Sequence, residues 1–177
     1  MKRYAILEVG PGAVILAASR HGLSELVITR RTKSAAERLA QKRWPEAAPD
    51  PILFPALREQ LRAYFAGQRV RFDVKLDLDA LTPFQRSVLR ACARIRYGAT
   101  MTYGQLADRV GHPGAARAVG GALARNPVPL VIPCHRVVAA DGSLGGFSAE
   151  QGVALKRWLL DLEAAKRPSS SDPAMTP

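Results

Sequence analysis

The sequence predicts a chain of two parts: an α/β unit over residues 1–80 and a mainly helical unit over residues 81–165. Short apolar runs joined by turn residues fill the first part, and the pair Thr82-Pro83 opens a series of helical patterns in the second. Two of those helices are joined by the tight turn HPG, which is typical of a helix-turn-helix. The remaining residues, 166–177, are polar and proline-rich, which predicts a disordered tail.

The first part is expected to contain strands and two helices. RYAILEV and AVILAAS are apolar runs joined by the hairpin signal GPGA, and ELVIT follows the turn RHG. KSAAERLAQKRW, with Ala36, Leu39 and Ala40 apolar, and ALREQLRAYFAG, closed by Gly67, are expected to be helices on either side of the proline-rich loop PEAAPDPILFP. VRFDVKLDLD alternates apolar and charged residues, so we expect a half-buried strand there.

The second part is expected to contain four helices. Thr82 is a good N-cap and Pro83 suits the first helical position, so FQRSVLRACARIR is predicted to be a helix that ends near Gly98. TYGQLADRVG and AARAVGGALARN are the two helices of the helix-turn-helix. Residues 150–165 are expected to form the last helix, with a buried stripe of Val153, Leu155, Trp158, Leu159 and Leu162.

Length and composition limit the class of protein. With 177 residues and 47% hydrophobic content, the chain can form one globular unit or two small ones. It has no run of about 18 apolar residues, which predicts no membrane span. The start, MKRYAILEVGPGAV, breaks its apolar run at Gly10-Pro11-Gly12 and predicts a strand and turn rather than a signal peptide. We therefore expect an intracellular, cytoplasmic protein.

The net charge of +11 is concentrated in one region. A surplus of this kind attracts any polyanion and alone is weak evidence for nucleic acid. Arginine pairs with phosphate through a bidentate fork, so a segment rich in arginine and almost without acidic residues favours a nucleic-acid surface. From Phe84 to Arg136 the acidic residues number one, Asp108, against Arg86, Arg90, Arg94, Arg96, Arg109, Arg117, Arg125 and Arg136.

The two cysteines, Cys92 and Cys134, have different surroundings in the sequence. Neither CxxC nor HxxxH spacing occurs, so we expect no metal site, and nothing in the sequence indicates a cofactor. A disulfide would be unusual in a reducing cytoplasm. Cys92 falls on the apolar stripe of a predicted helix, which is typical of a buried structural thiol.

Cys134 follows Pro133 at the end of an apolar run, and two interpretations stay open: a nucleophile or a packed core thiol. A free thiol with a pKa of about 8.5 is only a few per cent ionised at neutral pH, so a nucleophile needs a neighbouring base or cation. His135 is adjacent, but neighbours in a strand point to opposite sides. Direct contact between the two side chains therefore requires a turn or a bridging water.

Two further segments also admit two interpretations. The loop AADGSLGGFS, residues 139–148, is rich in glycine and suits close approach of the backbone to a ligand, or it is an ordinary hairpin with a DG turn. In AARAVGGALARN, residues 115–126, Arg117 and Arg125 are the only long polar side chains. Such a smooth helix suits a sugar-phosphate wall in a narrow groove, or close packing inside a core.

Together, the segments TYGQLA, RAVGGAL, NPVPLVIPCHRVV, GGFS and ALKRWLLDLE closely resemble, in order and spacing, the alkylguanine-DNA alkyltransferases. These are also called methylated-DNA–protein-cysteine methyltransferases. The resemblance covers roughly residues 82–163, and the first part fits the family in size and order of elements. It implies a ribonuclease-H-like α/β domain followed by a mainly α domain with a winged helix-turn-helix. The implied partner is double-stranded DNA carrying an alkylated guanine, bound through its minor groove by a monomer, with cooperative assembly on DNA as an alternative.

The resemblance also implies roles for residues of the reaction. Cys134 takes the alkyl group, His135 accepts the thiol proton through a water, and Glu163 orients that histidine. Asn126 braces the turn that carries the cysteine. Tyr103 helps rotate the nucleotide out of the duplex, lies beside the guanine ring and meets the developing charge of the leaving group.

Other residues are implied to bind the base or the DNA. Arg117 fills the gap left by the flipped base. Val137 and Ser148 line the pocket with backbone groups, and Phe147 packs on the base. The remaining residues implied at the DNA surface are Tyr103, Gly104, Ala116, Gly120, Leu123, Arg125 and Arg86.

The sequence departs from the family pattern in several places. Phe147 stands where many relatives have tyrosine, so a hydroxyl contact is lost while the stacking surface is kept. The loop between Ser148 and Lys156 is longer than in some relatives, and the zinc ligands that some members carry near the N-terminus are not matched. A related group of non-catalytic binders has tryptophan in place of the cysteine, whereas this chain keeps Cys134.

The chemistry of the product predicts a single reaction per molecule. An alkyl-cysteine is a thioether that water does not cleave, and no second cysteine lies in the motif to pass the group on. The predicted function is therefore irreversible, stoichiometric transfer of an alkyl group from 6-O-alkylguanine, and secondarily 4-O-methylthymine, to Cys134 after base flipping. The alternatives are a non-catalytic helix-turn-helix protein that recognises alkylated bases or regulates transcription, and a cysteine hydrolase.

Overall fold

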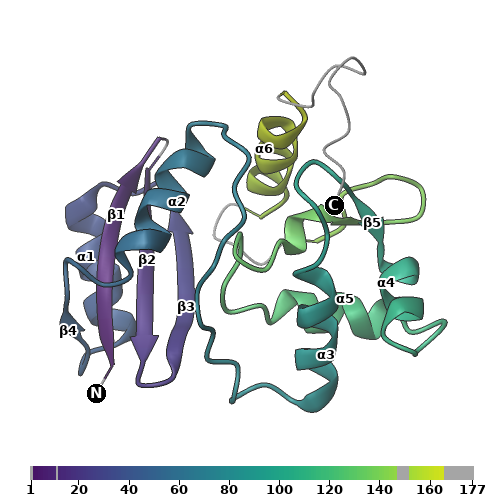
Figure 1. Ribbon diagram of the computed structural model, residues 1–177, viewed down its shortest axis with the longest axis horizontal. Helices are drawn as coiled ribbons and strands as arrows, with labels where there is room; N and C mark the ends of the chain where they lie inside the picture. The colour runs from purple at the N-terminus through teal and green to yellow at the C-terminus, as the bar shows by residue number, and fades with distance from the viewer. Residues whose placement is uncertain (1, 11, 147–151, 166–177) are drawn as a thin grey trace.

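The computed structural model describes residues 2–10, 12–146 and 152–165 and has two parts, a sheet with two helices and a mainly helical part (Figure 1). The strands of the first part are β1 (Arg3–Val9), β2 (Gly12–Ser19), β3 (Gly22–Thr29) and β4 (Ala48–Pro49). They lie in the order β3-β2-β1-β4, with β1, β2 and β3 antiparallel and β4 parallel to β1. The three predicted strands are confirmed. The short β4 lies in the proline-rich segment that was expected to be a loop.

Two helices cover the sheet, α1 (Lys33–Arg43) and α2 (Pro55–Phe65). Thr32 caps α1, and its buried Ala36 and Ala40 pack with Ile15 of β2. The second helix, α2, buries Leu57, Leu61 and Tyr64. Because both faces of the sheet are covered, the central strand β2 is buried from residue 13 to residue 18 and is apolar throughout.

The second part contains α3 (Pro83–Cys92), α4 (Tyr103–Arg109), α5 (Ala116–Ala124), the 3-10 helix η1 (Cys134–Arg136) and α6 (Gly152–Ala164). Its two short strands, β5 (Met101–Thr102) and β6 (Val137–Val138), are parallel. Capping boxes begin α3 and α4, where the Thr82 and Thr102 hydroxyls accept the amides of Gln85 and Gln105. The predicted helix-turn-helix is confirmed as α4 and α5.

The two parts share one hydrophobic core. A single cluster joins Leu7 and Val14 of the sheet to Tyr64 of α2 and, across the molecule, to Leu106 of α4 and Ile132 before η1. Helix α2 therefore packs both on the sheet and toward the second part. This arrangement brings Tyr64 of the first part close to His135, which follows Cys134 in the chain.

The segment at residues 70–79 is not the strand that its alternation predicts. It is an extended connection between the two parts, and it meets β3 at one point only, where Leu23 N–H donates to the Lys75 carbonyl and the Leu23 carbonyl accepts from Asp77 N–H, each at 2.8 Å. Its apolar residues, such as Phe72 and Val74, are half-buried as expected. The alternation correctly indicated a buried side, but a strand also needs a neighbour along its whole length.

Helix α3 ends at Cys92 and not near Gly98. The chain turns at this point, and backbone groups beyond the turn form hydrogen bonds with buried side chains of the second part. The Ile95 carbonyl accepts from Arg136 at 2.7 Å, and Gly98 N–H donates to Glu163 at 2.9 Å. The stripe predicted for α6 is also wrong at Val153, which is 44% exposed.

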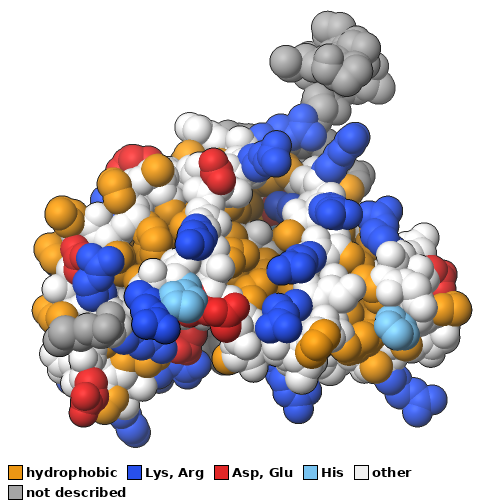
Figure 2. All heavy atoms as spheres, turned by 60° about the horizontal axis from the view of Figure 1, so that its bottom comes forward, with side chains coloured by type: hydrophobic (Ala, Val, Ile, Leu, Met, Phe, Trp, Pro, Cys, Tyr) orange, Lys and Arg blue, Asp and Glu red, His pale blue; other side chains and the backbone are white. Residues whose placement is uncertain are grey.

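Basic side chains gather on the helical part. Figure 2 shows Lys and Arg across this part on the face turned toward the viewer, whereas acidic side chains on that face lie mainly over the sheet part. Seven of the eight arginines noted in the sequence are at least partly exposed, but Arg136 is 6% exposed and is not part of a surface. No helix of the described residues is long and apolar enough to span a membrane.

Candidate active site around Cys134

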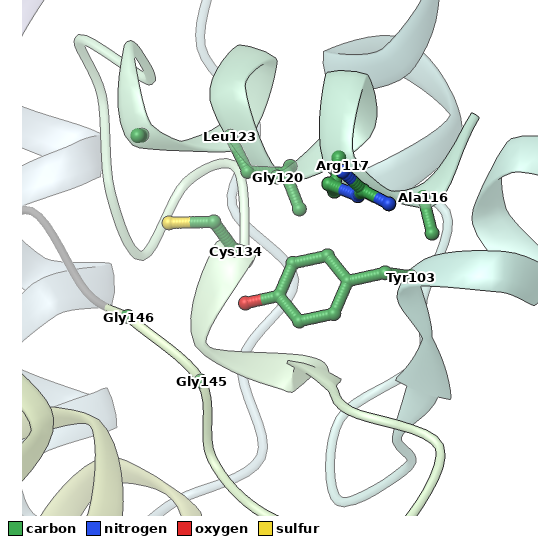
Figure 3. Close-up of a pocket in the computed structure, with 9 residues that line it drawn as sticks. Tyr103, Ala116, Arg117, Gly120, Leu123, Cys134, Gly145 and Gly146 are labelled. Atoms are coloured by element: carbon green, nitrogen blue, oxygen red, sulfur yellow. The ribbon is translucent and has the colours of Figure 1, made fainter.

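A pocket of about 570 Å³ opens beside Cys134 (Figure 3). Its walls come from the start of α4, one side of α5, the helix η1 and the loop after β6. In Figure 3 the hydroxyl end of Tyr103 points toward the Cys134 side of the pocket, and Arg117 projects from α5 on the other side of the ring. The lining residues are Tyr103, Ala116, Arg117, Gly120, Leu123, Ala124, Cys134, Gly145 and Gly146.

Cys134 lies in a tight turn, whereas the apolar run before it favoured an extended strand that ends at the cysteine. Pro133 has φ −81° and ψ 61°, and Cys134 N–H donates to the Ile132 carbonyl at 2.8 Å, which is an inverse γ-turn. Proline favours this turn because its ring fixes φ near the required value. The buried run before it is also bent, since Leu130 has a left-handed φ of 70°. The chain therefore reverses at the cysteine and enters η1.

Asn126 holds this turn and the thiol together. Its Nδ2 donates to the Cys134 Sγ at 3.1 Å and to the Ile132 carbonyl at 2.9 Å, and its Oδ1 accepts from Val128 N–H at 3.1 Å. Burial raises the pKa of the Cys134 thiol, while the Asn126 hydrogen bond and the nearby Lys156 ammonium act in the opposite direction. The resting thiol is therefore protonated at neutral pH and needs a base before it can react.

A buried polar network lies behind the turn. His135 is fully buried, and its Nε2 lies 2.8 Å from Glu163 Oε1. Glu163 accepts from Arg136 at both oxygens, with Nη2 2.9 Å from Oε1 and Nε 2.9 Å from Oε2. Although burial raises the pKa of Glu163, the hydrogen bonds from His135 and Arg136 outweigh it and hold that pKa well below its usual range. Glu163 is therefore an anion.

The ionised Glu163 determines the tautomer of His135. Because an anion can only accept, Nε2 must carry the hydrogen, and the lone pair is on Nδ1. Nδ1 is buried and has no hydrogen-bond partner among the described residues. Burial lowers the pKa of His135, and Glu163 only partly opposes this, so the ring is neutral at physiological pH. A neutral imidazole with a free Nδ1 can accept a proton.

Two buried cations, Lys156 and Arg136, were not expected from the sequence. Lys156 of α6 is fully buried; its Nζ donates to the Val137 carbonyl at 2.6 Å and to the Leu144 carbonyl, and lies 3.4 Å from Tyr103 Oη. It thus ties the glycine loop to β6. A signal was present, because Lys156 and Glu163 are seven residues apart on the buried face of α6 with Leu159 between them. Arg136 was taken for a surface arginine, and its pairing with Glu163 together with its hydrogen bond to the Ile95 carbonyl explains its burial.

One glycine makes room for Tyr103. A Cβ added at Gly145, which has φ +63°, would lie 2.8 Å from Tyr103 Oη, whereas one at Gly120 would be in ordinary van der Waals contact with the ring at 3.8 Å. Tyr103 therefore sits between the loop and α5. Burial raises the pKa of Tyr103, which keeps its hydroxyl protonated. Arg117 is exposed and has no hydrogen-bond or ion-pair partner in the described parts of the chain.

The other predicted site residues are placed as follows. Val137 is buried, and its carbonyl is used by Lys156; Phe147 and Ser148 lie outside the described residues. Arg125 folds back to the Gly121 carbonyl at 3.3 Å. Gly104 is partly exposed near the start of α4. Arg86 lies on α3 and, with three more arginines, lines a separate groove of about 490 Å³; those three are Arg90, Arg94 and Arg109.

One group in the described residues has a geometry that metal ions use. Ligand atoms of His21, Asp77 and Asp79 lie within 4.8 Å of one another where the β2–β3 turn meets the connection between the two parts. These side chains already bond to protein groups: His21 Nδ1 lies 3.1 Å from Asp79, and Asp77 accepts from Ser19. None of the three lines the pocket beside Cys134.

Known proteins share both parts of this architecture. Residues 83–165 match the family model of the 6-O-methylguanine DNA methyltransferase DNA binding domain, and residues 2–78 match that of its ribonuclease-like domain. A methylated-DNA–protein-cysteine methyltransferase of Methanosarcina acetivorans is 40% identical over 162 residues, which are 92% of this chain and 98% of that protein. The chain belongs to the 6-O-methylguanine DNA methyltransferase family. The resemblance noted in the sequence is thereby confirmed, as is the two-domain fold.

Further members of the methyltransferase family are similar in sequence and in structure. The methylated-DNA–protein-cysteine methyltransferase of Mycobacterium tuberculosis is 49% identical over 121 residues, which are 68% of this chain and 72% of that protein. A crystal structure of the Mycobacterium tuberculosis methyltransferase matches with a TM-score of 0.79 at 40% identity, covering 96% of each chain. A second structure from that organism, in complex with DNA, has the same TM-score and identity and covers 94% of this chain and 96% of its own.

Proposed function

We propose that this protein repairs DNA by direct, irreversible transfer of an alkyl group from 6-O-alkylguanine to the sulfur of Cys134. One observation carries the proposal. A thiol held by Asn126 opens into the same pocket as Arg117 and Ala116 of the helix-turn-helix, so a base that leaves a bound duplex has a path to the sulfur. Relatives named as methylated-DNA–protein-cysteine methyltransferases and a relative solved with DNA support it.

The DNA is bound by the helix-turn-helix in the minor groove. The exposed side of α5 is mostly alanine and glycine, which permits close approach to the sugar-phosphate walls. Arg117 has no partner among the described residues, so it is available to enter the base stack and replace the flipped nucleotide. Extrusion of a base costs a few kcal/mol, and a poorly paired 6-O-alkylguanine costs less. The other residues on or near this DNA-binding surface of α4 and α5 are Gly104, Gly120, Leu123 and Arg125.

Transfer begins with the thiol proton. His135 Nδ1 takes it from Cys134 Sγ through a water, and Glu163 stabilises the resulting imidazolium at Nε2. The thiolate attacks the alkyl carbon in line, the S–C bond forms, and the C–O bond to guanine breaks. Tyr103 donates its proton to the guanine anion and is reprotonated from His135. The net result is an S-alkyl thioether on Cys134 and normal guanine, and each molecule reacts once.

Phosphates beside the lesion are bound by the arginines of the second groove. This groove of about 490 Å³ is lined by Arg86, Arg90, Arg94 and Arg109 and by no acidic residue, and guanidinium groups bind phosphate in a bidentate manner. We assign the division between the two domains to residues 80 and 81. The monomeric state, cooperative assembly on DNA, the cytoplasmic location, 4-O-methylthymine as a second substrate, and base contacts by Val137, Phe147 and Ser148 stay predictions.

A mass measurement on the intact protein tests this function. After incubation with duplex DNA containing one 6-O-methylguanine, the wild-type protein gains one methyl group on the peptide that carries Cys134. Cys134→Ser binds the duplex and gains none, while Cys92→Ser gains one like the wild type. A wild-type protein that stays unmodified contradicts the proposal and favours a non-catalytic DNA binder. If the protein instead cleaved an ester or amide substrate repeatedly and without DNA, it would be a cysteine hydrolase.

A further inference from the structure

Tyr64 of α2 reaches the catalytic network from the ribonuclease-like domain. Its side chain is fully buried, and its hydroxyl donates to Glu163 Oε1 at 2.7 Å. The same hydroxyl lies 3.5 Å from His135 Nε2. The contact joins residues 99 positions apart in the chain, and it connects the first domain to the acid that holds the catalytic base.

Glu163 Oε1 receives three donors from two elements. Tyr64 comes from α2, while His135 and Arg136 come from η1; the other oxygen, Oε2, accepts from Arg136 and from Gly98 N–H. With both oxygens occupied, the carboxylate cannot rotate without losing bonds that are buried and costly to leave unmade. The position of Oε1 then determines how the imidazole of His135 is turned.

Aromatic neighbours hold the ring of Tyr64 in place independently of its hydrogen bond to Glu163. It packs against Phe65 and Phe72 with ring centroids 5.6 Å away, and against Tyr97 at 6.0 Å. Burial and the Glu163 charge raise the pKa of Tyr64, so its hydroxyl remains a donor throughout the working range of pH. A rigid donor of this kind is already oriented for the carboxylate.

We propose that Tyr64 is a positioning residue for alkyl transfer, in which its hydroxyl fixes Glu163 so that His135 presents a neutral Nδ1 toward the thiol. This inference rests on the proposed function and deepens it. The ribonuclease-like domain then has a part in the reaction itself, because it completes the network that receives the thiol proton. Tyr64 acts through Glu163 and touches neither the base nor the sulfur.

Loss of the hydroxyl has a direction that follows from electrostatics. The groups that face His135 are the Glu163 anion, the Arg136 and Lys156 cations, the Tyr64 hydroxyl and the thiol of Cys134. A donor to a carboxylate stabilises its charge in place and weakens its pull on a second proton. Without Tyr64 Oη, the Glu163 charge acts more strongly on the imidazole. His135 then becomes protonated at a higher pH and stops accepting the thiol proton there.

Tyr64→Phe tests this proposal, with Tyr97→Phe as a matched control. Tyr97 also has a buried hydroxyl and packs on Tyr64, but this hydroxyl has no hydrogen-bond partner among the described residues. Single-turnover rates on duplex DNA with 6-O-methylguanine are measured from pH 5.5 to 9 (about the range in which histidine titrates), and the His135 ring is titrated by NMR. At low pH the transfer rate should fall as His135 becomes protonated, and we call this part of the pH profile the acid limb. For Tyr64→Phe we expect the acid limb to move up by about one pH unit, so that the rate at a given pH on that limb is about tenfold lower than in the wild type. Tyr97→Phe keeps the wild-type limb, and the DNA affinity of both variants is unchanged.

Other outcomes decide the matter as clearly. If Tyr64→Phe and Tyr97→Phe have the same acid limb and the same His135 titration, Tyr64 is only a packing residue and the proposal is wrong. On a Glu163→Gln background, Tyr64→Phe should produce no further shift of the acid limb, and an additional shift also contradicts the proposal.

If Tyr64→Phe does not fold, 3-fluorotyrosine at position 64, a stronger donor of nearly the same shape, should move the acid limb to lower pH. If the wild type transfers nothing, the proposed function fails, and the NMR titration still tests the link from Tyr64 to His135.

Discussion

The two cysteines of this chain are both buried, yet only one has the surroundings of a nucleophile. Cys92 of α3 is 0% exposed and Cys134 of η1 is 5% exposed, and burial raises the pKa of each. The Cys92 sulfur has no hydrogen bond among the described residues, whereas Cys134 accepts from Asn126 and lines a pocket. Burial therefore does not separate a structural thiol from a reactive one. A donor to the sulfur, a neighbouring base and space for a substrate do.

The largest change in this comparison is expected from His135→Gln. In the wild type, burial holds the pKa of His135 below its usual value, so the ring is neutral and we expect a transfer rate that stays level from about pH 6.5 to 8.5. Without the base, the rate follows the thiolate fraction of Cys134 and rises about tenfold per pH unit. At neutral pH we expect a loss of about 10² to 10⁴-fold in single-turnover rate. His112→Gln, at an exposed position, is the control; parallel profiles for the two variants would show that His135 is not the base.

Asn126→Ala gives Cys134 the surroundings of Cys92, a buried thiol without a donor. It also leaves Val128 N–H without its acceptor, while the Ile132 carbonyl loses one of its two donors and keeps Cys134 N–H. One unsatisfied buried group costs about 1–3 kcal/mol, so we expect the free energy of unfolding in urea to fall by about that amount. The transfer rate should fall by about 10- to 100-fold, since one donor to a reacting atom contributes on this scale.

Asn126→Asp tests the role of the donor to the sulfur. It keeps the acceptor for Val128 N–H but replaces the donor to the sulfur and to the Ile132 carbonyl by a negative charge, so we expect a larger loss of transfer rate than in Asn126→Ala. Equal transfer rates for Asn126→Asp and the wild type would mean that the hydrogen bond to the sulfur does not matter.

Much of this comparison could be predicted from the sequence. The motif around Cys134 is local, so the cysteine, its histidine and the helix-turn-helix followed from a short stretch of chain. The apolar stripe of α3 likewise predicted the burial of Cys92. Such features depend on neighbours along the chain, which the sequence displays directly.

The rest depended on contacts between distant segments. Arg136 was grouped with surface arginines because its partner, Glu163, lies 27 residues away. Lys156 was counted as an ordinary helix residue, and the contact of Tyr64 with Glu163 spans 99 residues. A charged side chain is buried only where a tertiary partner compensates its desolvation, and no local pattern records that partner. The connection at residues 70–79 was mistaken for a strand because its pairing also depends on a distant segment. It bridges β3 only at Leu23 and Leu76.

A smaller effect is expected from Lys156→Met. Lys156 lowers the pKa of Cys134 and ties the Leu144 carbonyl to Val137, so its loss should slow the reaction of Cys134 with iodoacetamide at neutral pH. We expect a decrease of about tenfold or less, which corresponds to a thiol pKa about one unit higher or less. Arg157→Met removes a cation from the exposed side of the same helix and should leave the rate unchanged. A similar decrease in both variants would indicate a general effect of net charge.

The smallest effect is expected from Cys92→Ala. This side chain is buried on α3 and has no part in the proposed reaction, so the transfer rate should stay within about twofold of the wild type, less than 0.5 kcal/mol in activation free energy. Removal of one buried sulfur should lower the free energy of unfolding by about 1 kcal/mol. In the folded wild type, iodoacetamide should label Cys134 and spare Cys92, because Cys92 is 0% exposed whereas Cys134 lines the pocket; in denaturant it should label both. Native labelling of Cys92 at the rate of Cys134 would mean that both thiols are accessible, and the pocket would no longer distinguish them.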